Sequence, residues 1–374
     1  MHERRMTATT EFRYVSYTQE VIFGAGSISR FPELMNRFPW KRFILCTSRS
    51  MRSKGQVAAL EAAFGDRLLA IYDRVQPHVQ DTQVAEVLDL ARESNVDAVM
   101  GMGGGSPIGM AKAVGFQLDL PIIAIPTTYA GSEMTAVYGV THTDEFPPRK
   151  VTVSDPKITP RLVIYDPVLT LDLPPELTAS TGINALAHCI EALYSKTRNP
   201  LSTAAAVEGV RHIHNALFDC FKGGKKINTR SEMLLGSHLA GFSLASASMG
   251  LHHGLCHVLG GTANIPHGIA NSIILPHAIL FNADTTAPQL LPAAEAMGIS
   301  IKGDPPTEAI ERMRQTIHEL IGSMNLPQRL RDAGVAQSDL PQLAQIAFQN
   351  RTVQNNPKPI TAISQIEQIL EDAW

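Results

Sequence analysis

Short apolar runs alternate with amphipathic stretches in the first half of the chain. The apolar runs have the length of buried strands, and they are residues 42–47, 68–73, 97–102, 121–126 and 162–165. Between them, residues 55–64 and 82–94 repeat their apolar positions with the period of a helix. Runs that are apolar throughout are typical of strands covered on both faces. The pattern therefore predicts an α/β domain with a largely parallel sheet.

Residues 137–154 differ from these runs because two alternating stretches flank a loop that contains Pro147 and Pro148. This pattern predicts a β-hairpin, which we expect to be added to the same sheet.

The pattern becomes helical throughout in the second half of the chain. Helical periodicity is found in residues 177–195, 204–221, 230–248, 249–277, 307–324 and 363–374, with proline and glycine at the joins. A chain of 374 residues also exceeds the usual size of a single core. We therefore predict an α/β domain over residues 1–170 and an all-helical domain over residues 171–374.

Composition narrows the class of partner. The net charge of −3 gives no basic excess for nucleic acid or an anionic membrane, so a small molecule is the expected partner. The four cysteines show no CxxC spacing, which favours reduced thiols in a cytoplasmic protein. Residues 1–15 lack the apolar run of a signal peptide, and no window of about 18 apolar residues predicts a membrane span.

A glycine turn in residues 97–112 carries the first candidate chemistry. The segment DAVMGMGGGSPIGMAK predicts a strand, a turn of three glycines (103–105) and a helix, with Ser106 as its N-cap and Pro107 at its first position. The free N–H groups and positive dipole end of such a helix suit a pyrophosphate. The spacing is not the full GxGxxG fingerprint, so a purely structural tight turn is the alternative.

A second polar loop, PTTYAGSEMT at residues 126–135, follows the next predicted strand. Adjacent parallel strands place the loops at their carboxyl ends side by side. The two loops together therefore favour a dinucleotide ligand.

Histidines concentrate in residues 249–277. Five of the thirteen histidines lie there: His252, His253, His257, His267 and His277. His253 and His257 are four residues apart, as are Asn184 and His188 upstream, so each pair shares a helix face. Imidazole is both a common metal ligand and a proton carrier near neutral pH, so a metal site and an acid/base site are both open. Packing between helices is the alternative for any single histidine.

Four segments together resemble the signatures of the iron-containing, group III alcohol dehydrogenase family. They are GGGSPIGMAK, PTTYAGSEMT, STGINALAHCIEA and HHGLCHVLGGTANIPHG, they occur in the family's order, and they span most of residues 20–280. The resemblance implies a dinucleotide-binding α/β domain followed by an all-α catalytic domain, a fold shared with dehydroquinate synthase. It also implies NADH or NADPH as the cofactor, and a homodimer formed through the edge strand of the first domain.

Two positions depart from the family pattern. The family holds its metal with an aspartate and three histidines at positions that match Asn184, His188, His253 and His267 here, so the aspartate is missing. A neutral amide is a weaker ligand, which should weaken the binding of a divalent metal. The second departure is Gly109, which stands where the family motif GGGSxxDxAK has an aspartate. With PTTYAGSEMT, these departures resemble the maleylacetate-reducing branch, whose members act without metal in the bacterial breakdown of aromatic rings.

That branch implies reduction of the carbon–carbon double bond of maleylacetate, a dicarboxylate, to 3-oxoadipate. Hydride addition to a bond conjugated to a ketone yields a delocalised enolate, so hydrogen-bond donors and a proton source suffice. We expect His253 and His257 to supply the proton and to hold the enolate oxygen. His188 and His267 should be catalytic too, and with Asn184 and His253 they should bind the dianion through charge-assisted hydrogen bonds where the rings are protonated. The alternative is that His188 and His267 only pack helices together.

The expected cofactor contacts come from four places. Gly104, Gly105 and Ser106 should meet the pyrophosphate, and Thr127, Thr128 and Ser132 should lie near the nicotinamide. Lys150 matches a family lysine that reaches the ribose, with an ordinary exposed hairpin lysine as the alternative. Ser48 and Arg49 stand where the family often has an aspartate that disfavours the 2′-phosphate, so NADPH should be tolerated as well as NADH.

Three other functions remain open. One is a metal-dependent alcohol or lactaldehyde-type dehydrogenase in which Asn184 still ligates through its carbonyl. Another is a dehydroquinate synthase or glycerol dehydrogenase reaction on the same architecture, and the third is a non-catalytic nucleotide or metal-binding protein. The remaining histidines are expected at the surface or in packing: His212, His214, His238, His252, His277 and His318.

Overall fold

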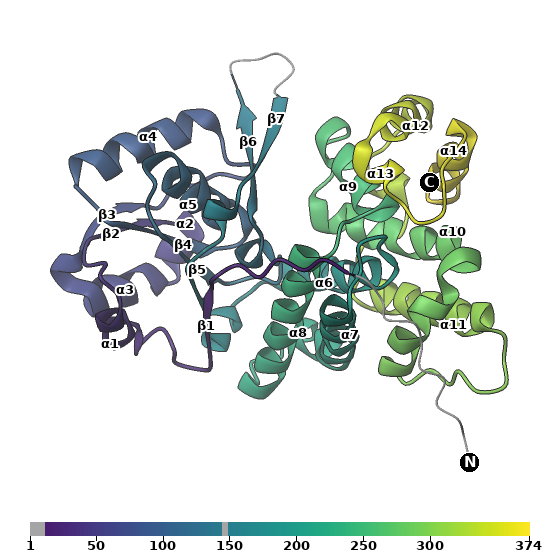
Figure 1. Ribbon diagram of the computed structural model, residues 1–374, viewed down its shortest axis with the longest axis horizontal. Coiled ribbons are helices and arrows are strands. Elements are labelled where there is room, and N and C mark those ends of the chain that lie inside the picture. Colours follow the sequence, from purple (N-terminus) through teal and green to yellow (C-terminus); the bar gives the residue numbers. More distant parts are fainter. Residues whose placement is uncertain (1–11, 144–148) are drawn as a thin grey trace.

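The computed structural model describes residues 12–143 and 149–374, and it places a sheet-based part beside a helical part (Figure 1). In Figure 1 the purple and blue ribbon of the first part lies on the left, and the green and yellow helices lie on the right. The last strand ends at Tyr165 and the first long helix begins at Pro175. The predicted combination of an α/β part and an all-helical part is confirmed. The loop with Pro147 and Pro148 lies outside the described residues.

Six parallel strands form the main sheet within the described residues, in the order β1-β8-β5-β4-β2-β3. Their bounds are Glu20–Phe23 (β1), Phe43–Cys46 (β2), Leu68–Tyr72 (β3), Ala98–Gly103 (β4), Ile122–Pro126 (β5) and Leu162–Tyr165 (β8). All five predicted strands are confirmed. Strands β2, β4, β5 and β8 are buried at every residue, as expected for a sheet covered on both faces.

Edge strand β1 was not among the predicted strands. Its four residues alternate between half-buried and exposed, because successive side chains of a strand point to opposite faces and the face with Val21 and Phe23 is exposed at this edge of the sheet. Such a short, half-exposed strand lacks the continuous apolar run that identified the others.

The hairpin prediction was right about the two strands and wrong about their place. Strands β6 (Val137–His142) and β7 (Arg149–Ser154) pair antiparallel, but they form a separate two-stranded sheet instead of extending the main one. The apolar side chains of the hairpin, Tyr138, Val140 and Val153, pack with the core beneath the helices instead. Burial of this apolar face decides where the hairpin sits.

Helices cover both faces of the sheet. Helices α1 (Phe31–Leu34), α2 (Arg49–Ser53) and α3 (Gln56–Phe64) contribute to one core, with Phe43 and Met100 from the strands. Helices α4 (Asp81–Glu93) and α5 (Gly105–Leu118) contribute to the other, with Ile44 and Val99. Neighbouring residues of one strand thus point into opposite cores, as the pleat requires.

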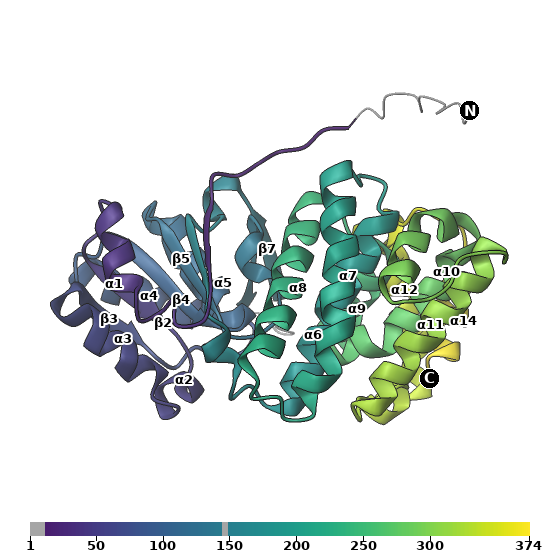
Figure 2. The same cartoon turned by 90° about the horizontal axis from the view of Figure 1, so that it is seen from below.

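Nine helices build the second part within residues 171–374. Their bounds are Pro175–Tyr194 (α6), Pro200–Phe221 (α7), Ile227–Ser246 (α8), Leu251–Thr262 (α9), His267–Ala296 (α10), Pro306–Ser323 (α11), Leu340–Gln349 (α12), Arg351–Gln354 (α13) and Ile363–Asp372 (α14). Figure 2 shows α6, α7 and α8 next to the sheet part and α10, α11 and α14 farther from it. None of the helices in the described part is long and apolar enough to cross a membrane.

Helix α6 lies at the centre of the helical part. Every residue from Gly182 to Tyr194 is buried, so this helix has no solvent-facing side over that length. A helix that is apolar on most sides belongs in a core. The few polar side chains on it, such as Asn184 and His188, are consequently held in the interior.

The predicted helical stretch 249–277 splits at Pro266. Helix α9 ends at Thr262, and α10 begins at His267 with Pro266 as its N-cap residue. Proline cannot continue the hydrogen bonding of a preceding helix, so the chain changes direction here. His253 and His257 therefore lie on one helix, and His267 lies at the start of the next.

Candidate active site

The glycine turn leaves open space in front of a helix start. Gly103 has a φ of 144°, and a Cβ there would lie 2.8 Å from Cγ of Pro107. Gly104 is the N-cap of α5, so the expectation that Ser106 caps the helix was wrong: the extended Gly104 already makes the turn, and Ser106 lies inside the helix. A Cβ on Gly105 would meet no atom within 4 Å. The first N–H groups of α5 face this space and suit a pyrophosphate.

The second polar loop lies directly beside the glycine turn, as predicted. Gly103 pairs with Pro126 at the ends of β4 and β5, and the N–H of Thr127 donates to the oxygen of Gly103 at 2.9 Å. A Cβ on Gly104 would lie 3.3 Å from the Thr128 side chain. A dinucleotide bound at the glycine turn would thus lie against this loop.

Strand β2 brings the Ser48 region to the same edge of the sheet. The hydroxyl of Thr47 donates to the oxygen of Met102 at 2.7 Å. Ser48, the N-cap residue of α2, follows and is half-buried. The nearby carboxylate of Asp73, after β3, forms an ion pair with Arg52 of α2. The negative charge at this strand end is thereby offset.

Lys112 is a buried residue that the sequence analysis missed. Its Nζ donates to the backbone oxygens of Ser132 (2.5 Å), Thr135 (2.7 Å) and Val137 (3.0 Å). Burial lowers the pKa of Lys112 to about 7, and the Glu133 carboxylate opposes this effect. Three bonds to carbonyl oxygens need the three N–H groups of the ammonium form. Lys112 therefore fixes the loop that contains Ser132.

Lys150 lies in β7 opposite Thr141. Its side chain falls outside the described part of the chain, so its contact with the cofactor stays a prediction.

The four predicted histidines come together between α6, α9 and α10. The ring centroids of His188 and His253 are 4.5 Å apart and nearly parallel, with an angle of 14° between the planes. The rings of His257 and His267 stack at 5.7 Å. His253 joins the two pairs, since its centroid is 6.4 Å from that of His257 and 6.0 Å from that of His267.

Burial separates these histidines into an inner and an outer pair. His188 and His253 are 3% and 2% exposed, whereas His257 and His267 are solvent-exposed. Burial, reinforced by the neighbouring rings, lowers the pKa of His188 and of His253 well below the ordinary value. The inner rings are therefore neutral in the free protein, and the expected protonation of His188 would require the charge of a bound anion.

The second polar loop also packs against α6. Asn184 donates through Nδ2 to the oxygen of Ala130 at 3.4 Å, and Thr181 accepts from the N–H of Tyr129 at 3.4 Å. A Cβ on Gly131 would lie 3.6 Å from Nδ1 of His188. The loop beside the glycine turn thus reaches the inner histidines, and a nucleotide and the histidine cluster would meet here.

Glu191 lies next to the inner pair, His188 and His253, and it was not among the site residues predicted from the sequence. It is fully buried on α6, and its Oε2 lies 2.6 Å from Nδ1 of His253. His252, predicted as a surface or packing residue, is fully buried beside both of them. Asn184, His188 and Glu191 are spaced four and three residues apart, so they share one face of α6. That spacing was the available signal.

The cluster offers neutral donor atoms to a ligand. Three buried atoms of the cluster have no hydrogen-bond partner among the described residues: Oδ1 of Asn184, Nδ1 of His188 and Nε2 of His253. These atoms could face a ligand, but they come from a neutral amide and neutral imidazoles. Imidazole is a usual ligand of Zn²⁺ and Fe²⁺, but this set contains no anionic ligand, which should weaken the binding of either cation.

Glu191, His252 and His253 form a second group whose ligand atoms lie within 4.8 Å of one another. Both oxygens of Glu191, however, already accept hydrogen bonds. Oε1 accepts from the N–H groups of Gly250 and His252, and Oε2 accepts from the N–H and Nδ1 of His253. These four contacts occupy the lone-pair sites of the carboxylate, so a cation bound by this group would have to displace at least one of them.

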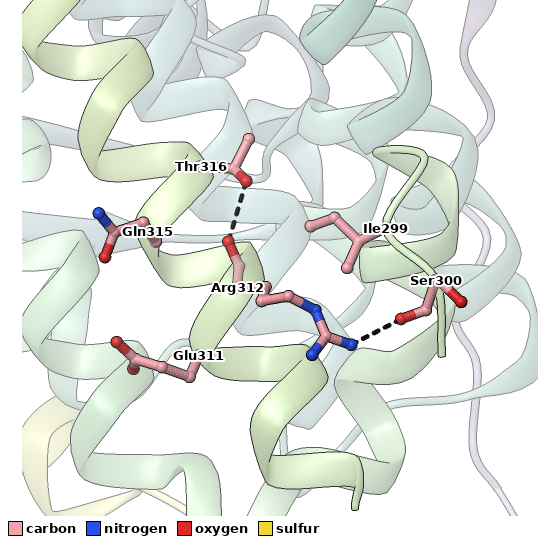
Figure 3. Close-up of a pocket in the computed structure, with 6 residues that line it drawn as sticks. All are labelled: Ile299, Ser300, Glu311, Arg312, Gln315 and Thr316. Atoms are coloured by element: carbon pink, nitrogen blue, oxygen red, sulfur yellow. Dashed lines mark hydrogen bonds between the residues drawn. The ribbon is translucent and has the colours of Figure 1, made fainter. Parts of the chain in front are cut away.

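A surface hollow of about 420 Å³ lies elsewhere, between α11 and the segment that follows α10 (Figure 3). Arg312 donates to the oxygen of Ser300 at 2.8 Å at its edge. It contains no histidine and none of the predicted site residues, so it has no part in the chemistry above.

Two family models match the chain. Iron-containing alcohol dehydrogenase matches residues 18–167, and the C-terminal part of the Fe-containing alcohol dehydrogenase family matches residues 178–374. Together they cover both parts of the structure.

Individual relatives are similar over nearly the whole length. Maleylacetate reductase of Pseudomonas knackmussii is 36% identical over 331 residues, which cover 88% of this chain and 89% of that protein. The crystal structure of maleylacetate reductase from Agrobacterium tumefaciens superposes with a TM-score of 0.88 at 31% identity and covers 98% of each chain. A crystal structure of 1,3-propanediol oxidoreductase gives a TM-score of 0.91 at 30% identity, over 98% of this chain and 100% of that one.

Proposed function

The chain belongs to the iron-containing alcohol dehydrogenase family, and we propose that within it this protein reduces maleylacetate with NADH or NADPH. One observation carries the proposal. The loop beside the glycine turn packs against a histidine cluster through an amide, Asn184. The motif resemblance matches Asn184 to the family's metal-binding aspartate. The similarity to maleylacetate reductases over most of the chain supports the same substrate.

The proposed reaction balances with one hydride and one proton. NADH, when bound, would supply the hydride to the alkene carbon β to the ketone, and the π electrons of the alkene would move to the ketone oxygen as an enolate. A proton then adds to the carbon α to the ketone, which gives 3-oxoadipate and NAD⁺. The bond is already polarised by the conjugated ketone, so the protein needs only to bind, orient and protonate.

The inner and outer histidines suit different parts of this work. His188 and His253 are buried and close together, so they can hold the ketone end in a water-poor site where hydrogen bonds are strong. His257 and His267 are exposed and can exchange protons with solvent. The dianionic substrate itself would favour protonation of the inner rings, because an opposite charge nearby stabilises the imidazolium form. We thus place the enolate oxygen near His253 and the proton source at His257.

We propose Gly104, Gly105 and Ser106 for the pyrophosphate, and Thr127, Thr128 and Ser132 for the nicotinamide side. Their support is the open space before α5 and the pairing of β4 with β5. Lys150 and Ser48 remain proposed contacts of the two ribose groups.

We propose that the reaction needs no metal. The support is the neutral donor set, together with the engagement of both Glu191 oxygens by N–H groups. The 1,3-propanediol oxidoreductase with a similar structure motivates the alternative, a metal-dependent alcohol dehydrogenase in which Asn184 ligates through Oδ1. That atom is buried and has no partner in the described part of the chain, which is the observation in its favour.

An assay of NADH loss with maleylacetate, alongside metal analysis of the same protein, separates the two functions. We expect turnover with maleylacetate that survives chelation, and little oxidation of simple alcohols. Loss of activity on chelation and its return with Fe²⁺ or Zn²⁺ would establish the metal-dependent alternative.

We also propose a cytoplasmic homodimer that acts in the breakdown of aromatic compounds. The four cysteines are free and buried, as expected in a reducing compartment. Edge strand β1 exposes Val21 and Phe23, and an open edge of this kind can pair with a second copy. Measurement of the mass in solution tests the dimer.

A further inference from the structure

Glu191 gathers four hydrogen bonds at the start of α9. Its Oε1 accepts from the N–H groups of Gly250 (3.0 Å) and His252 (3.1 Å). Its Oε2 accepts from the N–H of His253 at 3.3 Å and from Nδ1 of the same ring at 2.6 Å. We infer that Glu191 is a positioning residue, which holds His253 by Nδ1 so that Nε2 faces the substrate. The catalytic part of this inference rests on the proposed function.

The surroundings of Glu191 explain how a buried carboxylate can be kept there. A Glu191 carboxylate without hydrogen-bond partners would cost folding free energy, because the side chain is fully excluded from solvent. Three backbone N–H groups and the positive end of the α9 dipole compensate for that cost. Burial raises the pKa of Glu191, and these backbone hydrogen bonds oppose the rise. Both oxygens are fixed by backbone atoms, so the carboxylate cannot turn away from the His253 ring.

A fixed carboxylate determines which nitrogen of His253 reaches the cleft. Nδ1 must carry a proton to donate to Oε2, and this leaves Nε2 for any ligand. Nε2 is buried and has no hydrogen-bond partner in the described part of the chain. The ring also stacks on His188, which restricts rotation about its side-chain bonds. Nε2 therefore carries the lone pair while the ring is neutral, and it becomes the donor to the enolate oxygen once a bound dianion favours protonation of the ring.

The competing explanation is that Glu191 only caps α9. Capping would use the three backbone N–H groups and would need nothing from the ring. The contact to Nδ1 is the shortest of the four, which favours the positioning role. A measurement of which nitrogen of the His253 ring is protonated can separate the two roles.

The test is Glu191→Gln. An amide presents one oxygen and one NH₂ group, so it cannot accept from both sides of the helix start and from Nδ1 together. We expect kcat for maleylacetate reduction to fall about 100-fold, the scale of a misoriented acid/base group, with a smaller change in KM and NADH affinity within twofold of wild type. Nitrogen-15 NMR of labelled histidine should show the His253 ring changing its protonated nitrogen. The His253→Gln variant identifies that signal.

Asp166→Asn is the matched control, because Asp166 is also a fully buried carboxylate that accepts three backbone N–H bonds, from Gly26, Ile28 and Val168, but it contacts none of the clustered histidines. It should lose stability without changing the His253 signal. The inference is overturned if Glu191→Gln keeps its kcat, if the His253 signal does not move, or if Asp166→Asn loses kcat equally. The NMR readout needs no substrate, so it stands even if wild-type protein fails to reduce maleylacetate, a result that would refute the proposed function alone.

Discussion

Asn184 donates its side-chain Nδ2 to the backbone oxygen of Ala130, and this bond joins the helix of the inner histidine to the loop beside the glycine turn. Oδ1 of the same amide remains without a partner among the described residues. A carboxylate at this position could not donate to Ala130. The amide therefore contributes both to the join between the two parts and to the neutrality of the site.

We predict that Asn184→Asp converts the cluster toward a metal site. The added charge should raise the affinity for Zn²⁺ or Fe²⁺, measured as metal retained after dialysis, because the donor set gains its missing anion. It should also lower kcat/KM for maleylacetate at least tenfold, since it repels a dianion. Asn184→Ala, which removes the donor without adding charge, should retain no more metal than wild type. Equal metal content in all three proteins would contradict this prediction.

Replacement of either central histidine should slow reduction. We expect His253→Ala and His257→Ala to lower kcat/KM by about 10²–10⁴, the usual contribution of a general acid. His318→Ala, on remote helix α11, serves as the control and should leave the rate unchanged. Full activity in both site variants would rule out the assigned roles.

The preference for NADH or NADPH should depend on the residue at position 48. With Ser48 at the end of β2 and Asp73 paired with Arg52, wild-type kcat/KM for the two cofactors should differ by less than about 1000-fold, or ~4 kcal/mol. Ser48→Asp should increase the preference for NADH, because a carboxylate there repels the 2′-phosphate. Steady-state kinetics with each cofactor test both statements, and an unchanged ratio in the variant would place the ribose elsewhere.

Two glycines should behave in opposite ways. Gly131→Ala should destabilise the fold, because its φ of 78° disfavours an L side chain by about 1–2 kcal/mol and its Cβ would lie 3.2 Å from Cα of Gly241. Gly105→Ala should keep the melting temperature but weaken NADH binding, because its Cβ enters the space before α5. Thermal unfolding and NADH fluorescence titration separate these effects, and unchanged NADH affinity in Gly105→Ala would move the pyrophosphate away from this turn.

Stability should fall in mild acid. Burial lowers the pKa of His188 and His253 well below the usual value, whereas in the unfolded chain both titrate near ~6.5. Below about pH 6.5 the unfolded state therefore binds more protons, and stability decreases as the pH falls toward the folded-state values. The titration of these two rings should therefore add a decline in melting temperature below about pH 6.5 and no slope above about pH 7. His188→Gln should reduce that slope, and an unchanged slope would mean that His188 does not titrate in this way.

Much of the fold could be predicted from local pattern. Strands β2, β4, β5 and β8 are apolar throughout, because both faces of the sheet are covered, and this made them visible in the sequence. Edge strand β3 was predicted from its apolar run although it is only partly buried. Edge strand β1 is half-exposed and has no such apolar run, so it was not predicted. The alternating pattern of the hairpin predicted its two strands but not where they pack. Its partner is the apolar surface beside α4 and α5, which no local pattern specifies.

The sequence by itself determined the glycine turn, the helical spacing of His253 and His257, and the amide at Asn184, since these depend on residue type and on neighbours a few positions away. Only the tertiary structure decided that His188 and His253 are buried while His257 and His267 face solvent, and that Glu191 holds the His253 ring. These relationships join helices 60 or more residues apart along the chain. Burial and hydrogen bonding between distant segments arise from packing, which periodicity along one segment cannot reveal.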